Sequence, residues 1–103
     1  MITSVQGIAW LNRDNVIDIA LSDDGVLINH ALITRILLFF GTQIIDSAIT
    51  PSLFDLSSQS KVVFKPGFSG LAIGSYQVGV VTYDVSNPDG LRWGDVVIIV
   101  KQG

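Results

Sequence analysis

One stretch of the chain decides the fold, and it reads Ser75-Tyr76-Gln77-Val78-Gly79-Val80-Val81-Thr82-Tyr83-Asp84-Val85. Apolar and aromatic residues recur at every second position, so that one face carries Tyr76, Val78, Val80 and Thr82. Successive side chains of a β-strand point to opposite faces, whereas an α-helix repeats about every 3.6 residues. The period of two therefore predicts a long β-strand over 75–85.

The sequence after this strand predicts a hairpin. Asn87-Pro88-Asp89-Gly90 has turn chemistry, because its proline fixes φ and its glycine tolerates a positive φ. Residues 91–101 then predict a last strand that is apolar on both faces, which is typical of a central strand or of one covered by a neighbouring subunit. Antiparallel pairing across the turn brings Trp93 close to Tyr83, and we expect these two rings to brace the hairpin.

Upstream, shorter segments rich in apolar and β-branched residues are separated by residues that favour turns. The apolar run 31–40 fits either a buried strand or a buried helix, but its β-branched and aromatic residues favour a strand. Gly41-Thr42 and Asp24-Gly25 predict hairpin turns. Pro51 begins an irregular stretch with room for a single helical turn. The remaining predicted strands span 5–11, 16–21, 26–28, 43–47 and 61–65.

The composition of the whole chain agrees with a β protein. Among 103 residues there are 13 isoleucines and 12 valines against 5 alanines and no glutamate, and β-branched residues favour strands. A hydrophobic content of 49% with 15% charged residues excludes intrinsic disorder. We therefore expect a single all-β domain over 1–103, an antiparallel sandwich or barrel of about seven to eight short strands. It has no disulfides, since the chain has no cysteine.

Charge and hydropathy narrow the class of partner. The net charge is −3 and the basic residues are scattered, so we expect no nucleic acid as a partner. Met1-Ile2-Thr3-Ser4 lacks the basic and long apolar regions of a signal peptide, and no apolar run reaches the roughly 18 to 20 residues that span a membrane. A mean hydropathy of +0.54 is high for a small protein and indicates surface reserved for a protein partner.

The residues needed for common catalytic or metal sites are scarce. His30 is the only histidine and cysteine is absent, so zinc sites and Cys-His nucleophiles lack their side chains. A Ser-His-Asp triad would need His30, but the chain contains no Gly-x-Ser-x-Gly motif. We interpret His30 as a polar residue in a link between strands, and we expect no enzymatic activity and no cofactor.

Acidic residues and glycines near turns have a similar explanation. Four oxygen-bearing side chains surround the last turn, but their spacing does not match an EF-hand loop, so turn chemistry is favoured over a calcium site; they are Asp84, Asn87, Asp89 and Asp95. Three glycines occupy a predicted loop and do not precede a helix, which argues against a phosphate-binding loop; they are Gly67, Gly70 and Gly74.

The aromatic residues have three possible interpretations. Their flat faces suit a stacking platform for sugars or bases, but each lies in an alternating strand pattern that favours core packing. A third reading places them at an assembly interface. The residues concerned are Trp10, Tyr76, Tyr83 and Trp93.

The C-terminal third carries a resemblance to a known class of proteins. Gly74-Ser75-Tyr76, Val80-Val81-Thr82-Tyr83-Asp84 and Asn87-Pro88-Asp89-Gly90-Leu91-Arg92-Trp93-Gly94 are followed by an aliphatic strand. Thr34-Arg35-Ile36-Leu37-Leu38 and Ile45-Asp46-Ser47 add to the pattern. Together these segments resemble small virion proteins of tailed bacteriophages.

The resemblance implies an immunoglobulin-like β-sandwich with a structural role in the virion. The implied function is a capsid decoration or cement protein that bridges major capsid subunits, with a tail, baseplate or head-tail component as the alternative. Other virion proteins are then the partners, the chain is a homo-oligomer or bound to a lattice, and it is made in the host cytoplasm. A carbohydrate-binding adhesion module is a further alternative, and a hydrolase is the third. The structural or interface candidates are Trp93, Tyr83, Tyr76, Pro88 and Gly90.

Overall fold

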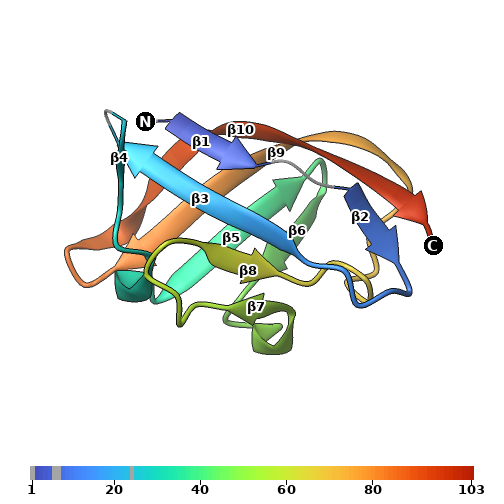
Figure 1. Cartoon of the computed structure of the whole chain (residues 1–103), viewed down its shortest axis with the longest axis horizontal. Coiled ribbons are helices and arrows are strands. Elements are labelled where there is room, and N and C mark those ends of the chain that lie inside the picture. The colour runs from blue at the N-terminus through green and yellow to red at the C-terminus, as the bar shows by residue number, and fades with distance from the viewer. Residues whose placement is uncertain (1, 6–7, 24) are drawn as a thin grey trace.

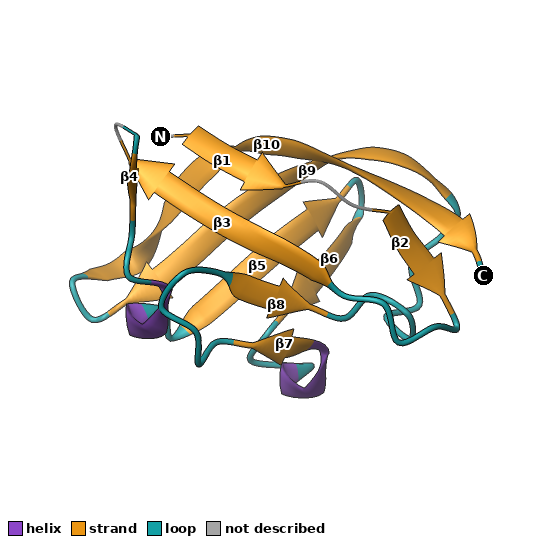
Figure 2. Cartoon of the chain, viewed as in Figure 1, coloured by secondary structure: helices purple, strands orange, loops and turns teal. Residues whose placement is uncertain are grey.

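The computed structural model describes residues 2–5, 8–23 and 25–103, with side chains from residue 8 onward except at position 95. Two β-sheets pack face to face around a shared hydrophobic core (Figure 1). The helical segments that the structure describes are two short 3₁₀ turns, η1 (His30–Leu32) and η2 (Pro51–Leu53), which Figure 2 shows in purple. The predicted all-β fold is confirmed.

The first sheet has the strand order β1-β3-β8-β7, and β4 pairs with the end of β3. All of these neighbours run antiparallel. The predicted return strand after the Asp24-Gly25 turn corresponds to β4, and residue 24 itself lies outside the described residues. The bounds are β1 (Ile2–Val5), β3 (Ile17–Asp23), β4 (Val26–Leu27), β7 (Phe54–Asp55) and β8 (Val62–Phe64).

The second sheet has the strand order β2-β10-β9-β5-β6. Its neighbours run antiparallel except β2, which runs parallel to β10. β5 and β6 form the predicted hairpin at Gly41-Thr42, where Gly41 has a φ of +63°. The bounds are β2 (Ile8–Leu11), β5 (Arg35–Phe40), β6 (Gln43–Asp46), β9 (Gly74–Asp84) and β10 (Asn87–Gln102).

This strand order is that of an immunoglobulin-like sandwich. In such a fold the first, second, fifth and fourth strands form one sheet, and the third, sixth and seventh form the other. β1-β3-β8-β7 and β10-β9-β5 reproduce the two sheets in this order, with β6 added beside β5. The described residues form ten strands: seven build this framework, and the short strands β2, β4 and β6 add to it.

The core lies between the sheets and takes alternate residues from each strand. Val78, Val80 and Thr82, which alternation places on one face of β9, are buried, so this face points into the core. Phe64 of β8 stacks on Phe54 of β7 with ring centroids 5.1 Å apart. The largest of the fully buried side chains are Trp93, Phe40, Phe64, Ile17, Ile19 and Leu21.

Two predicted strand boundaries are wrong. The strand predicted over 5–11 is two strands, and β1 lies in the first sheet whereas β2 lies in the second; residues 6 and 7 between them lie outside the described residues. The strand predicted over 31–40 begins only at Arg35, because residues 30–32 form η1. The Asn29 side chain accepts the Ala31 backbone N–H at 3.1 Å and so caps that turn.

The predicted turn at Asn87-Pro88-Asp89-Gly90 is also misplaced. The turn is Val85-Ser86, and β10 already begins at Asn87, which pairs with Asp84. The register shifts between Asn87 and Leu91, so Pro88 and Gly90 lie in a bulge of the strand. A bulge accepts proline because the ladder of hydrogen bonds is interrupted there and needs no N–H from that residue. It accepts glycine because glycine can take a positive φ.

Candidate interaction surface

The outer side of the second sheet is apolar over several strands. Alternation along each strand turns one set of side chains away from the core, and register pairs Leu37 with Val81 and Phe39 with Ile44. Ile44 and Val97 are each 56% exposed. We name this set the outer apolar face, and it consists of Leu37, Phe39, Ile44, Val81, Val97 and Ile99. Val97 lies opposite Gln77 of β9, and Ile99 lies opposite Ser75. Exposed apolar residues gathered on one face of a sheet are candidates for an interaction site.

An ion pair between partly exposed Arg35 and buried Asp46 borders the outer apolar face at β5 and β6. The Arg35 guanidinium donates to both carboxylate oxygens of Asp46, with an Nε to Oδ1 distance of 3.0 Å. Asp46 is buried, and its Oδ1 also accepts the Ala48 backbone N–H at 2.9 Å. The hydrogen bond from Arg35 holds the pKa of the Asp46 carboxyl below its usual value and raises the pKa of Arg35. The pair therefore supplies a fixed polar margin to an apolar surface.

Aromatic rings and basic side chains continue this margin. The Arg35 guanidinium lies 5.2 Å from the centroid of the Tyr83 ring, and the Lys101 ammonium lies 5.8 Å from that of Trp10. Both are cation-π contacts. Gly79 is buried beneath Arg92, since a Cβ at position 79 would lie 2.7 Å from Nη1 of Arg92. Arginine and aromatic residues next to apolar ones are typical of protein interfaces.

Trp93 and Tyr83, which were predicted to contact each other, lie on opposite faces of the second sheet. Trp93 is 2% exposed, and its Nε1 donates to Oγ1 of Thr82 at 2.8 Å inside the core. Tyr83 points outward and packs beside Gly90, where a Cβ would lie 3.0 Å from Cε1 of the ring. The predicted ring contact is wrong because Leu91 pairs with buried Thr82 and alternation turns Trp93 to the same inner side. Tyr83, the neighbour of Thr82, faces the outer side.

The remaining structural candidates lie apart from one another. Tyr76 donates its hydroxyl to the Ala72 carbonyl at 2.8 Å and meets the Phe40 ring edge-on, with centroids 5.6 Å apart. Pro88 is exposed in the bulge of β10. With Trp93 in the core and Tyr83 below Arg35, the four aromatic residues do not form one shared platform.

His30 has a structural environment. It is fully buried, its Nε2 accepts the Leu21 backbone N–H at 2.9 Å, and its Nδ1 donates to the Gln59 carbonyl at 3.0 Å. Only the neutral tautomer with a proton on Nδ1 satisfies both bonds, because a backbone N–H cannot accept. His30 thus ties η1 to β3 and to the segment before β8. Its burial is a tertiary property that the sequence did not reveal.

Near the last turn, the side chain of Asp84 holds the turn together by hydrogen bonds. Oδ1 of Asp84 accepts the backbone N–H of Asn87 at 2.8 Å and its Nδ2 at 2.9 Å. Among the described residues, no group of three or more histidine, cysteine or acidic side chains is placed to hold a metal ion. The side chain of residue 95, a further member of the predicted set, lies outside the described part of the chain.

One edge of the second sheet is protected against pairing with another chain. The Gln43 side chain donates to the Gly70 carbonyl at 3.1 Å and accepts the Ala72 N–H at 3.2 Å, which fastens a loop along β6. The Asp46 carbonyl accepts the backbone N–H of Thr50 at 2.9 Å. A loop fastened beside β6 covers part of the edge at which a further strand could be added.

Comparison with known proteins identifies no relative: no family model, no curated protein and no solved structure matches the chain. Within the described residues, no helix has the length and apolar character needed to cross a membrane.

Proposed function

We propose that this protein is a non-enzymatic structural component of a tailed-phage virion, a capsid decoration or cement protein that binds its neighbours through the outer apolar face. The observation that carries the proposal is that face itself, which combines half-buried Leu37 and Phe39 with exposed Ile44 and Val97. Burying such residues against a partner stabilises an assembly by about 25 cal/mol for each Å² of apolar surface removed from water.

The surroundings of the face support a docking role over a catalytic one. The strongest ion pair near it, Arg35 with Asp46, is satisfied internally, and His30 is satisfied within the core. Catalytic groups need to reach a substrate, whereas these groups hold the scaffold in shape. A rigid apolar surface with a fixed polar margin fits association with another protein.

A carbohydrate-binding role receives less support from the geometry. Sugar stacking requires aromatic rings that are exposed together, but Trp93 lies in the core and Tyr83 lies under a guanidinium. Trp10 packs with Lys101 instead. The described aromatic residues therefore favour packing and margin contacts over a glycan platform.

Mass spectrometry of purified phage particles tests the proposal. We expect the chain in the particles at hundreds of copies, the number that a capsid lattice requires. A few to tens of copies would instead assign it to the tail, baseplate or head-tail junction. Absence of the chain from particles of a phage that expresses it would overturn the virion role.

A further inference from the structure

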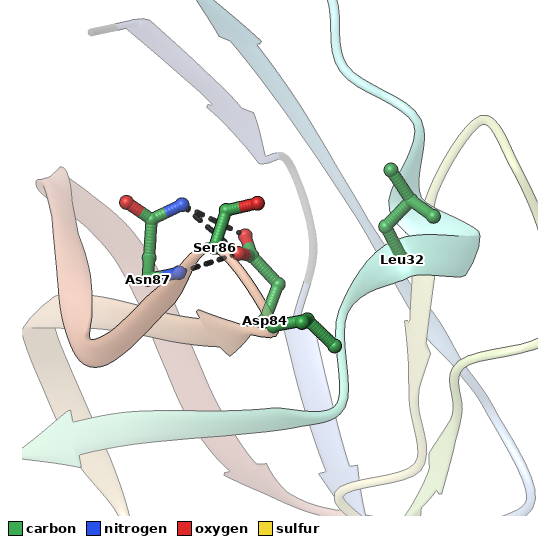
Figure 3. A pocket seen from close by; sticks show the side chains of 5 residues that line it. Leu32, Asp84, Ser86 and Asn87 are labelled. Carbon is green, nitrogen blue, oxygen red and sulfur yellow. Dashed lines mark hydrogen bonds between the residues drawn. The ribbon is translucent and has the colours of Figure 1, made fainter.

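A small cleft opens at one end of the sandwich, between the β9–β10 turn and η1 (Figure 3). It has a volume of about 330 Å³ and is lined by Leu32, Asp84, Val85, Ser86 and Asn87. Ligand pockets range from about 300 to 1,000 Å³, so a cleft of this size suits one side chain rather than a whole cofactor. It is separate from the outer apolar face.

The cleft has two exposed apolar walls. Val85 is 91% exposed and Leu32 is 65% exposed. Asn12 is the one non-glycine residue with a positive φ in the described part of the chain, so the turn at Val85 and Ser86 does not require glycine or asparagine and accepts a valine. Both side chains are therefore open to contact with the apolar part of a ligand.

Both walls stand on backbone that is held in place. The turn is closed by the hydrogen bonds from Asn87 to Asp84 that Figure 3 shows as dashed lines. Leu32 belongs to η1, which His30 anchors through its bonds to Leu21 and Gln59. Preorganised walls lower the entropy cost of binding. The buried His30 contributes to this by holding η1 in place.

The polar chemistry of the cleft selects a cation. Oδ1 of Asp84 accepts both short bonds from Asn87, whereas Oδ2 accepts only a longer one, at 3.2 Å from Nδ2. Oδ2 therefore keeps capacity to accept from an incoming donor. The lining includes this carboxylate and no lysine or arginine. A donor with a positive charge forms the strongest hydrogen bond to such an oxygen.

We propose that this cleft binds the side chain of a lysine or arginine that projects from a partner protein. The aliphatic stem contacts Leu32 and Val85, and the cationic group donates to Oδ2 of Asp84. Long basic side chains commonly bury their stems on apolar surface in this way. The inference rests on the proposed function only for the statement that the ligand belongs to a protein.

Titration of the ¹⁵N-labelled protein with Nα-acetyl-arginine N-methylamide, and separately with its lysine counterpart, tests the cleft by NMR. We expect saturable shifts of the amides of residues 32 and 84–87. The stronger of the two probes identifies the preferred cation. The citrulline counterpart, which has nearly the shape of arginine without the charge, is expected to bind at least about tenfold more weakly, because it loses a charge-assisted bond.

Matched variants locate the bond. Asp84→Asn keeps an oxygen that can accept from Asn87 and removes the charge, so we expect about tenfold weaker binding. Asp89→Asn removes a charge from the same bulged strand outside the cleft lining and leaves binding unchanged. Leu32→Ser is expected to weaken binding without altering the β9–β10 turn. This variant therefore tests the cleft even if Asp84→Asn loosens the turn.

Either of two results would overturn the cleft: shifts that do not saturate, or equal effects of the Asp84 and Asp89 variants. These results concern the cleft alone. They leave the presence of the chain in particles, which the mass spectrometry measures, as a separate question.

Discussion

Trp93 is the residue on which the core depends most. It is the largest of the fully buried side chains, and its indole N–H is satisfied by Thr82. Truncating a buried tryptophan to alanine removes about 3 to 5 kcal/mol, a large share of the about 5 to 15 kcal/mol that holds a small domain together. We expect Trp93→Ala to unfold the isolated protein, as measured by a thermal melt followed by circular dichroism.

Thr82→Val is the matched control at this site. It keeps the volume of the side chain and leaves the indole N–H of Trp93 without an acceptor, which costs about 1 to 3 kcal/mol. It is therefore expected to lower the melting temperature by less than Trp93→Ala does. A Trp93→Ala protein that melts like the wild type would contradict the placement of this residue in the core.

Asp46 gives the protein a defined sensitivity to acid. Its pKa is lowered in the folded state, chiefly by the hydrogen bond from Arg35. A lowered folded pKa contributes stability that is present above the unfolded value, near 3.8, and is lost as the pH falls through the folded value. We expect the urea concentration at the midpoint of unfolding to decrease as the pH is lowered through this range. Asp46→Asn should make this decrease smaller.

Asp55→Asn provides the comparison for this effect. The pKa of Asp55 is also lowered, mainly by the hydroxyl of Ser57, but its side chain is exposed and water screens its interactions. We expect a smaller change in the acid slope than for Asp46→Asn. An acid profile that Asp46→Asn leaves unaltered would show that the Arg35 pair does not contribute to folding.

Among the elements, the β9–β10 hairpin has one part that the sequence predicts, the strand β9, and one part that it does not, the position of the turn. β9 was predictable because its alternation is a local property with a period of two. The position of the turn was not, because Asn-Pro-Asp-Gly suits a bulged strand as well as a turn. The Asp84 side chain and the strand register decide between them, and register depends on the neighbouring strand.

Gly90 is the residue that makes the bulge feasible. It has a φ of +88°, and a Cβ there would lie 2.9 Å from Cγ1 of Val81 and 3.0 Å from the Tyr83 ring. A left-handed backbone costs an L-residue about 1 to 2 kcal/mol before any clash. We expect Gly90→Ala to lower the melting temperature by several degrees, whereas Gly94→Ala, which meets open space, changes it little. Equal shifts in the two variants would argue against the bulge.

The other elements show the same limit. Residues 31–40 were predicted as one strand from their composition, but η1 forms at the start because His30 is drawn into the core by Leu21 and Gln59. The first predicted strand divides between the sheets, which local patterning does not encode. The turn chemistry of Asp84 and Asn87 was predictable, whereas the cleft beside it requires that η1 and the turn be adjacent in space.

At the scale of the whole molecule, the sandwich places part of the apolar surplus, including Ile44, Val97 and Ile99, on the outer apolar face, while other apolar residues such as Phe68 and Ile49 are exposed elsewhere. The sequence predicted that surplus from its hydropathy and sparse charge, but not its position, since exposure depends on which strands neighbour each other. β5 and β10 contribute inward residues to the core and outward residues to the outer apolar face. Gln43 fastens a loop along one edge of the second sheet.

The central claim is that the outer apolar face binds the partner, and particle binding by two matched variants tests it most directly. Val97→Asp places a charge within the face, whereas Val16→Asp places one on a valine of similar exposure, 49% against 56%, outside it. Each purified variant, checked by a thermal melt for its fold, is added to phage particles that lack the chain. We predict that Val16→Asp binds like the wild type and that Val97→Asp binds at least about tenfold more weakly, because an unpaired charge is costly to bury. Equal binding of the two folded variants would contradict the account.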